Sequence, residues 1–140
     1  KFNFYPDCFN SAIKKLNDLI IHVGFCKSKK EYEYWLLKAD VLPVTSHQDF
    51  FGLSVIEAVS AYTYPILPNR LSYPEIFDKK NNPEIFYNSK NELYCKLSSY
   101  LNDYKILRYS SSKYKDLVSR FDWSTMVDKY DKKFEEIYNY

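Results

Sequence analysis

Short apolar runs alternate with longer amphipathic segments along the whole of this 140-residue chain. The short runs lie at residues 20–23, 41–44, 64–67 and 85–87, and each is brief and apolar enough for a strand buried on both faces. Strands that alternate with helices in this way are typical of an α/β fold, here a Rossmann-like parallel sheet with helices on both faces. Pro65 places the third run at a strand start or at the sheet edge rather than at its centre.

Three Ser and Glu pairs have capping-box spacing, in which both side chains satisfy free backbone amides at a helix start. They predict helices that begin at Ser28, Ser72 and Ser89, with Glu31, Glu75 and Glu92 as the second members. Apolar residues at helical spacing predict two more helices, one over 11–19 and one over 123–137. No repeat or linker divides the chain, so we expect one continuous unit.

Composition excludes several classes of protein. A hydrophobic content of 46% excludes a disordered chain, and the presence of only two glycines excludes a dinucleotide fingerprint or a Walker-type loop. The net charge of +2 gives no independent indication of a nucleic-acid or membrane surface. Three scattered cysteines predict a cytoplasmic protein, and we find neither metal-ligand spacing nor an apolar run long enough for a membrane span.

Residues 47–61, HQDFFGLSVIEAVSA, are the most informative stretch. The helix that follows Gly52 is apolar or small on every side, and Glu57 is its one charged residue, so we expect both to be buried. A buried carboxylate needs a partner. That partner is either an Arg, a Tyr hydroxyl or backbone amides elsewhere in the domain, or the hydroxyls of a ribose. If Glu57 lies on an open solvent face, its ribose-binding role is lost.

The turn before this helix is a candidate anion site, because free amides at a helix start bind a diphosphate. The residues that would present these amides are Phe50, Phe51, Gly52 and Leu53. Asp49 directly precedes the turn, although a single acid before a helix is usually only a cap. His47 is placed to contact sugar or phosphate. Arg70, which follows the 64–67 run, is either a phosphate ligand or a surface residue.

The segment DFFGLSVIE, from Asp49 to Glu57, resembles the E-x7-E motif of retaining GT-B glycosyltransferases, with Asp in place of the first Glu. The longer run TSHQDFFGLSVIEAVSAYTYPILPNRLSYPEIF resembles a narrower group, the tRNA-queuosine mannosyltransferases and their bacterial relatives. The triplet Tyr73-Pro74-Glu75 is part of this likeness. HVGF and SKKEYEYWLLKADV upstream, and FDWSTMVDKYDKKFEEIY at the tail, extend it over nearly the whole chain.

The resemblance implies a role for each matching residue. Asp49 would be the catalytic residue that holds the hydroxyls of the donor sugar, and Glu57 would bind the donor ribose. Phe50, Phe51, Gly52 and Leu53 would contact the donor phosphates and sugar, and Phe25 and Cys26 would lie against the nucleobase. The donor implied is a nucleotide-diphosphate sugar, GDP-mannose, used without a metal or another cofactor.

The resemblance also implies that residues 1–140 are the C-terminal, nucleotide-sugar-binding domain of a GT-B enzyme, truncated at its N-terminus. The first strand or strands, ending at residues 2–4, the Arg and Lys that clamp the diphosphate, and the acceptor domain would then lie upstream. The acceptor suggested is queuosine in tRNA. We expect such a chain to fold without catalysing transfer and to self-associate through an exposed sheet edge.

A non-catalytic Rossmann-like nucleotide-binding or interaction module is the alternative function. Two departures from the family pattern favour it. Asp49 is one methylene shorter than Glu, and Ala61-Tyr62-Thr63 stands where the family has a glycine, so the turn there must tolerate a Cβ.

Overall fold

The computed structural model describes residues 7–103, 107 and 109–138, so the strand end expected at 2–4 lies outside them. The chain forms two compact units, Lys1–Tyr32 and Glu33–Tyr140, and each is described by itself.

The first unit contains α1 (Asp7–Leu16), the 3-10 turn η1 (Asn17–Leu19) and the start of α2 (Lys29–Lys38). The helix expected over 11–19 is confirmed over 11–16, with an earlier start, and its last three residues form the 3-10 turn. The strand expected at 20–23 is wrong, because these residues form no strand and the side chains of Ile21 and Val23 are exposed. The amide of Ile20 bonds to the carbonyl of Asn17 instead, which closes the preceding turn rather than a sheet ladder.

Three short parallel strands form the sheet of the second unit, in the order β1 (Val41–Pro43), β2 (Tyr64–Pro68) and β3 (Phe86–Tyr87). They confirm three of the four expected runs. Every residue of β2 is buried. Pro65 lies at the start of this strand, as predicted, but the edge position is wrong because β2 is the central strand. A proline near a strand's first residue removes only one ladder donor, and that position tolerates the loss.

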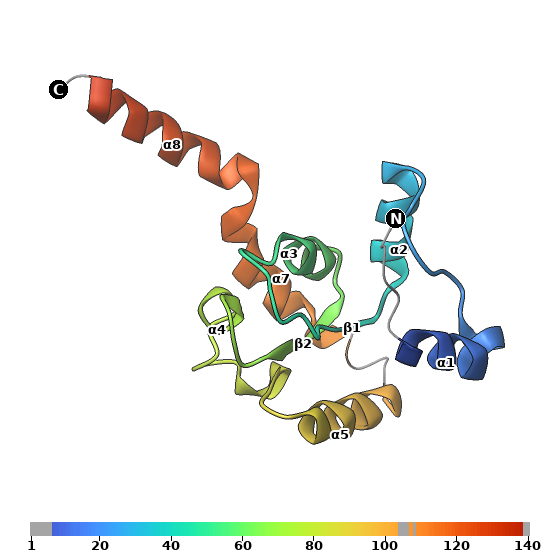
Figure 1. The fold of residues 1–140 in the computed structure, drawn as a ribbon. Coiled ribbons are helices and arrows are strands. Elements are labelled where there is room, and N and C mark those ends of the chain that lie inside the picture. The colour runs from blue at the N-terminus through green and yellow to red at the C-terminus, as the bar shows by residue number, and fades with distance from the viewer. Residues whose placement is uncertain (1–6, 104–106, 108, 139–140) are drawn as a thin grey trace. The chain divides into compact units, whose positions relative to one another are not determined.

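Helices lie on both faces of the sheet, which confirms the Rossmann-like α/β arrangement (Figure 1). α3 (Leu53–Ser60) contacts β2 from above in the view of Figure 1, and α5 (Lys90–Leu101) contacts β2 and β3 from below. α4 (Tyr73–Ile76) and the turn η2 (Pro83–Ile85) connect β2 to β3. α7 (Ser112–Val118) packs on α3 and leads through η3 (Ser119–Phe121) to α8 (Trp123–Tyr138).

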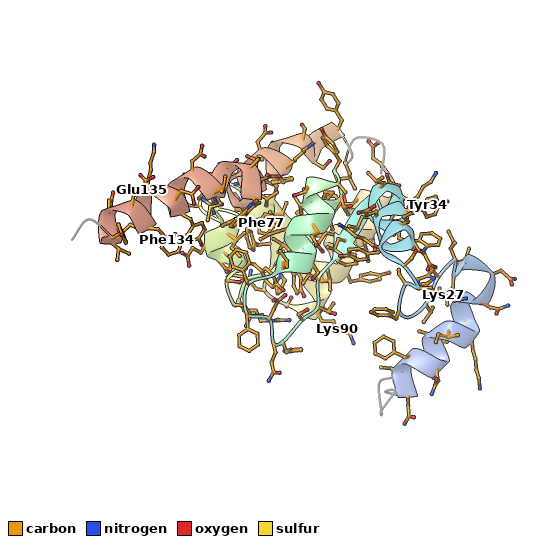
Figure 2. All side chains as sticks on the ribbon, turned by 90° about the horizontal axis from the view of Figure 1, so that it is seen from above. Lys27, Tyr34, Phe77, Lys90, Phe134 and Glu135 are labelled. Atoms are coloured by element: carbon orange, nitrogen blue, oxygen red, sulfur yellow. The ribbon has the colours of Figure 1, made fainter. Side chains whose placement is uncertain are left out.

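The core of the second unit gathers apolar side chains from the strands, α3, α4 and α7. Figure 2 shows Phe77 among these interior side chains, and this residue is completely buried. The tail helix forms as predicted, but its apolar stripe is not covered by the residues that the structure describes. Phe134, labelled on α8 in Figure 2, is 65% exposed.

Two of the three expected helix caps are present. Ser28 Oγ accepts the amide of Glu31 at 3.2 Å, and Ser89 Oγ accepts the amide of Glu92 at 3.1 Å. The cap expected at Ser72 is wrong, because its backbone is already helical and its side chain makes no capping bond. A cap residue needs an extended backbone to turn its oxygen toward the third amide of the helix.

Candidate functional site

The loops that follow β1 and β2 meet at the carboxyl edge of the sheet, and Asp49 joins them. Its Oδ1 accepts the backbone amide of Gly52 at 2.7 Å, and its Oδ2 accepts the hydroxyl of Tyr73 at 2.7 Å. Asp49 is half-buried, whereas Tyr73 is completely buried. The carboxylate is therefore held at both oxygens, once by the turn before α3 and once by the first residue of α4.

Gly52 is the N-cap of α3 and has the left-handed backbone φ of 79°, which only glycine adopts without strain. A Cβ at this position would lie 2.9 Å from Cε1 of the Tyr73 ring. The amides of Val55 and Ile56 both donate to the Gly52 carbonyl at 3.0 Å. The turn thus requires glycine both for its backbone conformation and for the closeness of the Tyr73 ring.

Tyr73 remains a hydrogen-bond donor at neutral pH. Burial, followed by the hydrogen bond to Asp49, raises the pKa of Tyr73 to about 12. Deprotonation would place a second negative charge beside the carboxylate, which explains the direction of the shift. The Tyr73 hydroxyl therefore keeps its proton, and can donate it to Asp49, throughout the physiological range of pH.

Arg70 forms a second bridge between the two loops. Its Nε donates to the carbonyl of Ser46 at 3.0 Å, and its Nη2 donates to the carbonyl of Thr45 at 3.3 Å. The side chain is half-buried, and its role as a phosphate ligand stays a prediction. No local pattern in the sequence indicates this bridge, because its partners are 24 and 25 residues away.

The predicted turn residues lie together at the start of α3, but they differ in exposure. Phe50 is fully exposed and Leu53 is 61% exposed, while Phe51 packs edge-to-face on Phe121 with ring centroids 5.2 Å apart. His47 is exposed on the same loop. The expectation of free amides along the whole turn is wrong in one respect, because the Gly52 amide is already bonded to Asp49.

Glu57 is exposed, so the expectation that it is buried is wrong. α3 is not buried on every side: one face, with Leu53, Ser54, Glu57 and Ser60, is open, and the opposite face packs into the core. Because serine is small, Ser54 and Ser60 are compatible with a buried helix in the sequence pattern. In the structure both are exposed. The exposed position removes the argument for a buried partner, and the ribose-binding role expected of Glu57 is lost with it.

Phe25 and Cys26 lie in the first unit, whereas the Asp49 site is built entirely within the second. Phe25 is 97% exposed. The Sγ of Cys26 lies 3.8 Å from Nε2 of His22, and Nδ1 of His22 lies 3.9 Å from Oε1 of Glu31. Their contact with a nucleobase stays a prediction.

The departure at Ala61-Tyr62-Thr63 has a structural explanation. Tyr62 has a left-handed φ of 67°, the conformation that a glycine supplies without strain. Contacts from α7 and its N-cap hold it there. Ser111 Oγ donates to the Tyr62 carbonyl at 2.7 Å, and Nζ of Lys115 donates to its hydroxyl at 2.9 Å and lies 4.0 Å from the ring centroid. The turn tolerates a Cβ, as predicted.

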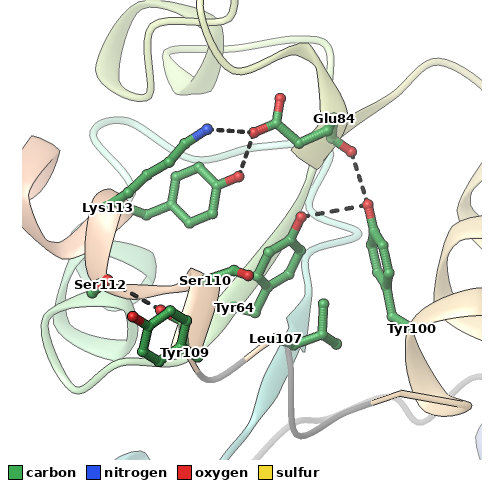
Figure 3. A pocket seen from close by; sticks show the side chains of 9 residues that line it. Tyr64, Glu84, Tyr100, Leu107, Tyr109, Ser110, Ser112 and Lys113 are labelled. Atoms are coloured by element: carbon green, nitrogen blue, oxygen red, sulfur yellow. Dashed lines mark hydrogen bonds and ion pairs between the residues drawn. The ribbon is translucent and has the colours of Figure 1, made fainter.

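A second carboxylate, Glu84, lies at a cavity of about 550 Å³ that is rich in tyrosine (Figure 3). Its Oε1 accepts the hydroxyl of Tyr114 at 2.5 Å and Nζ of Lys113 at 2.7 Å. Its backbone carbonyl accepts the hydroxyl of Tyr100 at 3.1 Å. No local pattern in the sequence indicates this cluster, because its members are up to 30 residues apart and form no motif.

Two kinds of feature are absent from the part of the chain that the structure describes. No three His, Cys, Asp or Glu side chains gather there in a way that would hold a metal ion. None of the helices in the same part is both long and apolar enough to cross a membrane.

Comparison with known proteins adds a relative. The chain is 32% identical over 127 residues to the tRNA-queuosine alpha-mannosyltransferase of Drosophila melanogaster. The chain is similar to a glycosyltransferase. The match covers 89% of this chain and 32% of the fly protein, so the chain spans about a third of the relative's length. No family model matches, and no solved structure matches.

Proposed function

We propose that this chain is the donor-binding domain of a retaining GT-B glycosyltransferase. Its donor is a nucleotide-diphosphate sugar, GDP-mannose, and its acceptor is queuosine in tRNA. The observation that carries the proposal is the Asp49 turn at the carboxyl edge of a parallel sheet, within a segment similar to a mannosyltransferase. This edge is where open α/β sheets bind their ligands.

Asp49 is the residue that we assign to the donor sugar. Each carboxylate oxygen accepts more than one hydrogen bond, so the bonds from Gly52 and Tyr73 leave acceptor capacity for sugar hydroxyls. The exposed residues His47, Phe50 and Leu53 lie on or next to the same turn, and we assign them to the donor site. Glu57 matches the second acid of the motif in its spacing from Asp49, but it is exposed, so we do not assign it to the ribose.

In the proposed reaction the donor is held by its phosphates, and the acceptor attacks the sugar on the face that the diphosphate leaves. The protein contributes position and stabilisation of the charge that builds on the diphosphate, more than proton transfer. The leaving diphosphate needs cations as well as the amides at the start of α3. We place those cations, and the acceptor site, in the upstream part of the full-length enzyme.

A non-catalytic nucleotide-binding or interaction module is the second candidate. Two observations favour it: both oxygens of Asp49 are engaged within the chain, and Glu57 is exposed. In such a module Asp49 would have only a structural role, since its two hydrogen bonds fix the turn.

Titration of the full-length protein with GDP-mannose separates the two candidates. Steady release of GDP, together with mannose transfer to queuosine-containing tRNA, supports the enzyme, whereas saturable binding without turnover supports the module. The 140-residue chain alone is expected to fold, to bind GDP-mannose weakly in calorimetry and to transfer nothing. Transfer by this chain at the full-length rate would contradict the division into donor and acceptor domains.

Two further properties belong to the same proposal. We expect a cytoplasmic protein, on the grounds of its scattered cysteines. We also expect the short sheet to pair with a second copy through an edge strand, which light scattering of the 140-residue chain would detect as dimers.

A further inference from the structure

Tyr73 opens the triplet Tyr73-Pro74-Glu75, which the proposed function does not use. Helix capping does not account for the triplet, because Ser72 makes no capping bond. The Tyr73 ring is completely buried and belongs to the core, so its position is fixed by packing. Its hydroxyl donates to Oδ2 of Asp49 at 2.7 Å, and the side chain of Ser46 is its second hydrogen-bond partner.

The ring and the hydroxyl of Tyr73 restrain the Asp49 turn in two different ways. The ring packs against Gly52, where no side chain would fit. The hydroxyl fixes one carboxylate oxygen of Asp49 while the Gly52 amide fixes the other. A carboxylate bonded at both oxygens has a defined rotamer, and the lone pairs that remain point in defined directions.

We infer that Tyr73 is the positioning residue of the donor site, and that it orients the Asp49 carboxylate toward the hydroxyls of the donor sugar. The expected effect on catalysis rests on the proposed function. The orientation of Asp49 rests only on its two hydrogen bonds. It also accounts for the shorter acid in this chain. The space between Gly52 and Tyr73 fits an Asp side chain, and a Glu would carry its carboxylate about 1.5 Å further, past at least one of its two donors.

The 140-residue chain allows a direct test of the orientation. It holds two glycines, Gly24 and Gly52, so a spectrum of the chain labelled with ¹⁵N-glycine contains two amide signals. In Tyr73→Phe we expect the Gly52 amide proton to shift and to exchange with solvent about tenfold faster, because Asp49 is released to rotate. Gly24 should keep its signal. An unchanged Gly52 signal in Tyr73→Phe would overturn the inference.

Tyr87→Phe is the matched control. Tyr87 is also a buried tyrosine, and its hydroxyl also donates a 2.7 Å hydrogen bond, but to the carbonyl of Val44 rather than to Asp49. Both variants lose one buried hydroxyl. Only Tyr73→Phe should change the Gly52 amide, and an equal change in Tyr87→Phe would assign the effect to general loosening and overturn the inference.

The catalytic consequence is tested in the full-length enzyme. Tyr73→Phe should lower kcat about tenfold and leave the Kd for GDP within about twofold, because misplacing a group by a fraction of an ångström acts on the transition state. In an Asp49→Ala background the same change should have no further effect on kcat. An additive loss would overturn the inference. Failure of the proposed function is a separate result: the unmodified enzyme would not release GDP, while the Gly52 signal would still respond to Tyr73→Phe.

Discussion

Two carboxylates in the second unit are each held by a buried tyrosine hydroxyl, and they differ in what else holds them. Glu84 is paired with Tyr114 and also with the cation of Lys113. Asp49 is paired with Tyr73 and a backbone amide, and no ion pair joins it to a cation among the described residues. Both carboxylates are half-buried, so exposure alone does not separate them.

The electrostatics of the two sites follow from this difference. Burial raises the pKa of Glu84, but the hydrogen bonds from Lys113 and Tyr114 lower it by more, so the pKa lies below its ordinary value. Burial and the bond to Glu84 raise the pKa of the Tyr114 hydroxyl. A carboxylate neutralised by its own lysine is a structural link between η2 and α7. Asp49 is held by neutral donors only, without an ion pair among the described residues, and this difference agrees with the donor site that we propose there.

The largest effect is expected on turnover. Asp49→Ala in the full-length enzyme should lower kcat about a hundredfold, as removal of one preorganised stabilising group does. Glu84→Ala should leave kcat unchanged at a temperature at which both variants are folded. Steady-state kinetics with GDP-mannose measure both. A loss of kcat in Glu84→Ala as large as that in Asp49→Ala would erase the distinction between the two carboxylates.

Asp49→Glu sharpens the same comparison. The longer side chain should change kcat more than the affinity for GDP, because in the proposed function Asp49 contacts the sugar, whereas the affinity would come mostly from base, ribose and phosphates. Calorimetry with GDP and initial rates with GDP-mannose give the two numbers. Equal effects on affinity and turnover would contradict this division.

Gly52→Ala should destabilise the fold by about 3 kcal/mol, because it combines a strained left-handed φ with overlap on the Tyr73 ring. Urea unfolding of the 140-residue chain measures the change. Gly24→Ala is the matched control: Gly24 also has a positive φ, of 105°, but nothing lies within 4 Å of its added Cβ. A larger loss of stability in Gly52→Ala than in Gly24→Ala supports the contact with Tyr73, and equal losses would contradict it.

Glu84→Ala should lower the free energy of unfolding by about 2 kcal/mol, because it leaves the buried hydroxyl of Tyr114 without its acceptor. Glu135→Ala, an exposed acid on α8, should leave the stability unchanged. The same urea titrations compare them. Equal stability of the two variants would mean that the Glu84 cluster does not hold α7 in place.

The smallest effect is on the pH dependence of stability. Since the folded state lowers the pKa of Glu84, this carboxylate stabilises the fold above its unfolded pKa, and the stabilisation is lost as pH falls through the lowered folded value. Thermal unfolding of the chain between pH 7 and pH 3 should therefore show a fall below about pH 4.5 that is shallower in Glu84→Gln. Parallel curves for the two proteins would contradict the assignment.

Local patterns in the sequence determined most of the secondary structure. Short apolar runs gave the three strands, Ser28 and Ser89 marked helix starts, and Gly52 marked the turn before α3. These features depend on residues a few positions apart, whose backbone preferences act before any tertiary contact forms. The strand predicted at 20–23 does not form, because a strand requires a neighbouring strand and a local pattern does not show whether one is present.

Tertiary structure decided which groups meet and which face solvent. Asp49 and Tyr73 are 24 residues apart, and Glu84 and Tyr114 are 30 apart, so neither pair has a local signature. The sequence marked Asp49 and the Tyr73 triplet separately, and only the parallel pairing of β1 with β2 brought them to one edge. Glu57 is the opposite case, because the composition of α3 indicated burial and the packing of one face against the core left the other face open. Burial is a property of the packed layers, whereas residue spacing along a helix is a property of the chain itself.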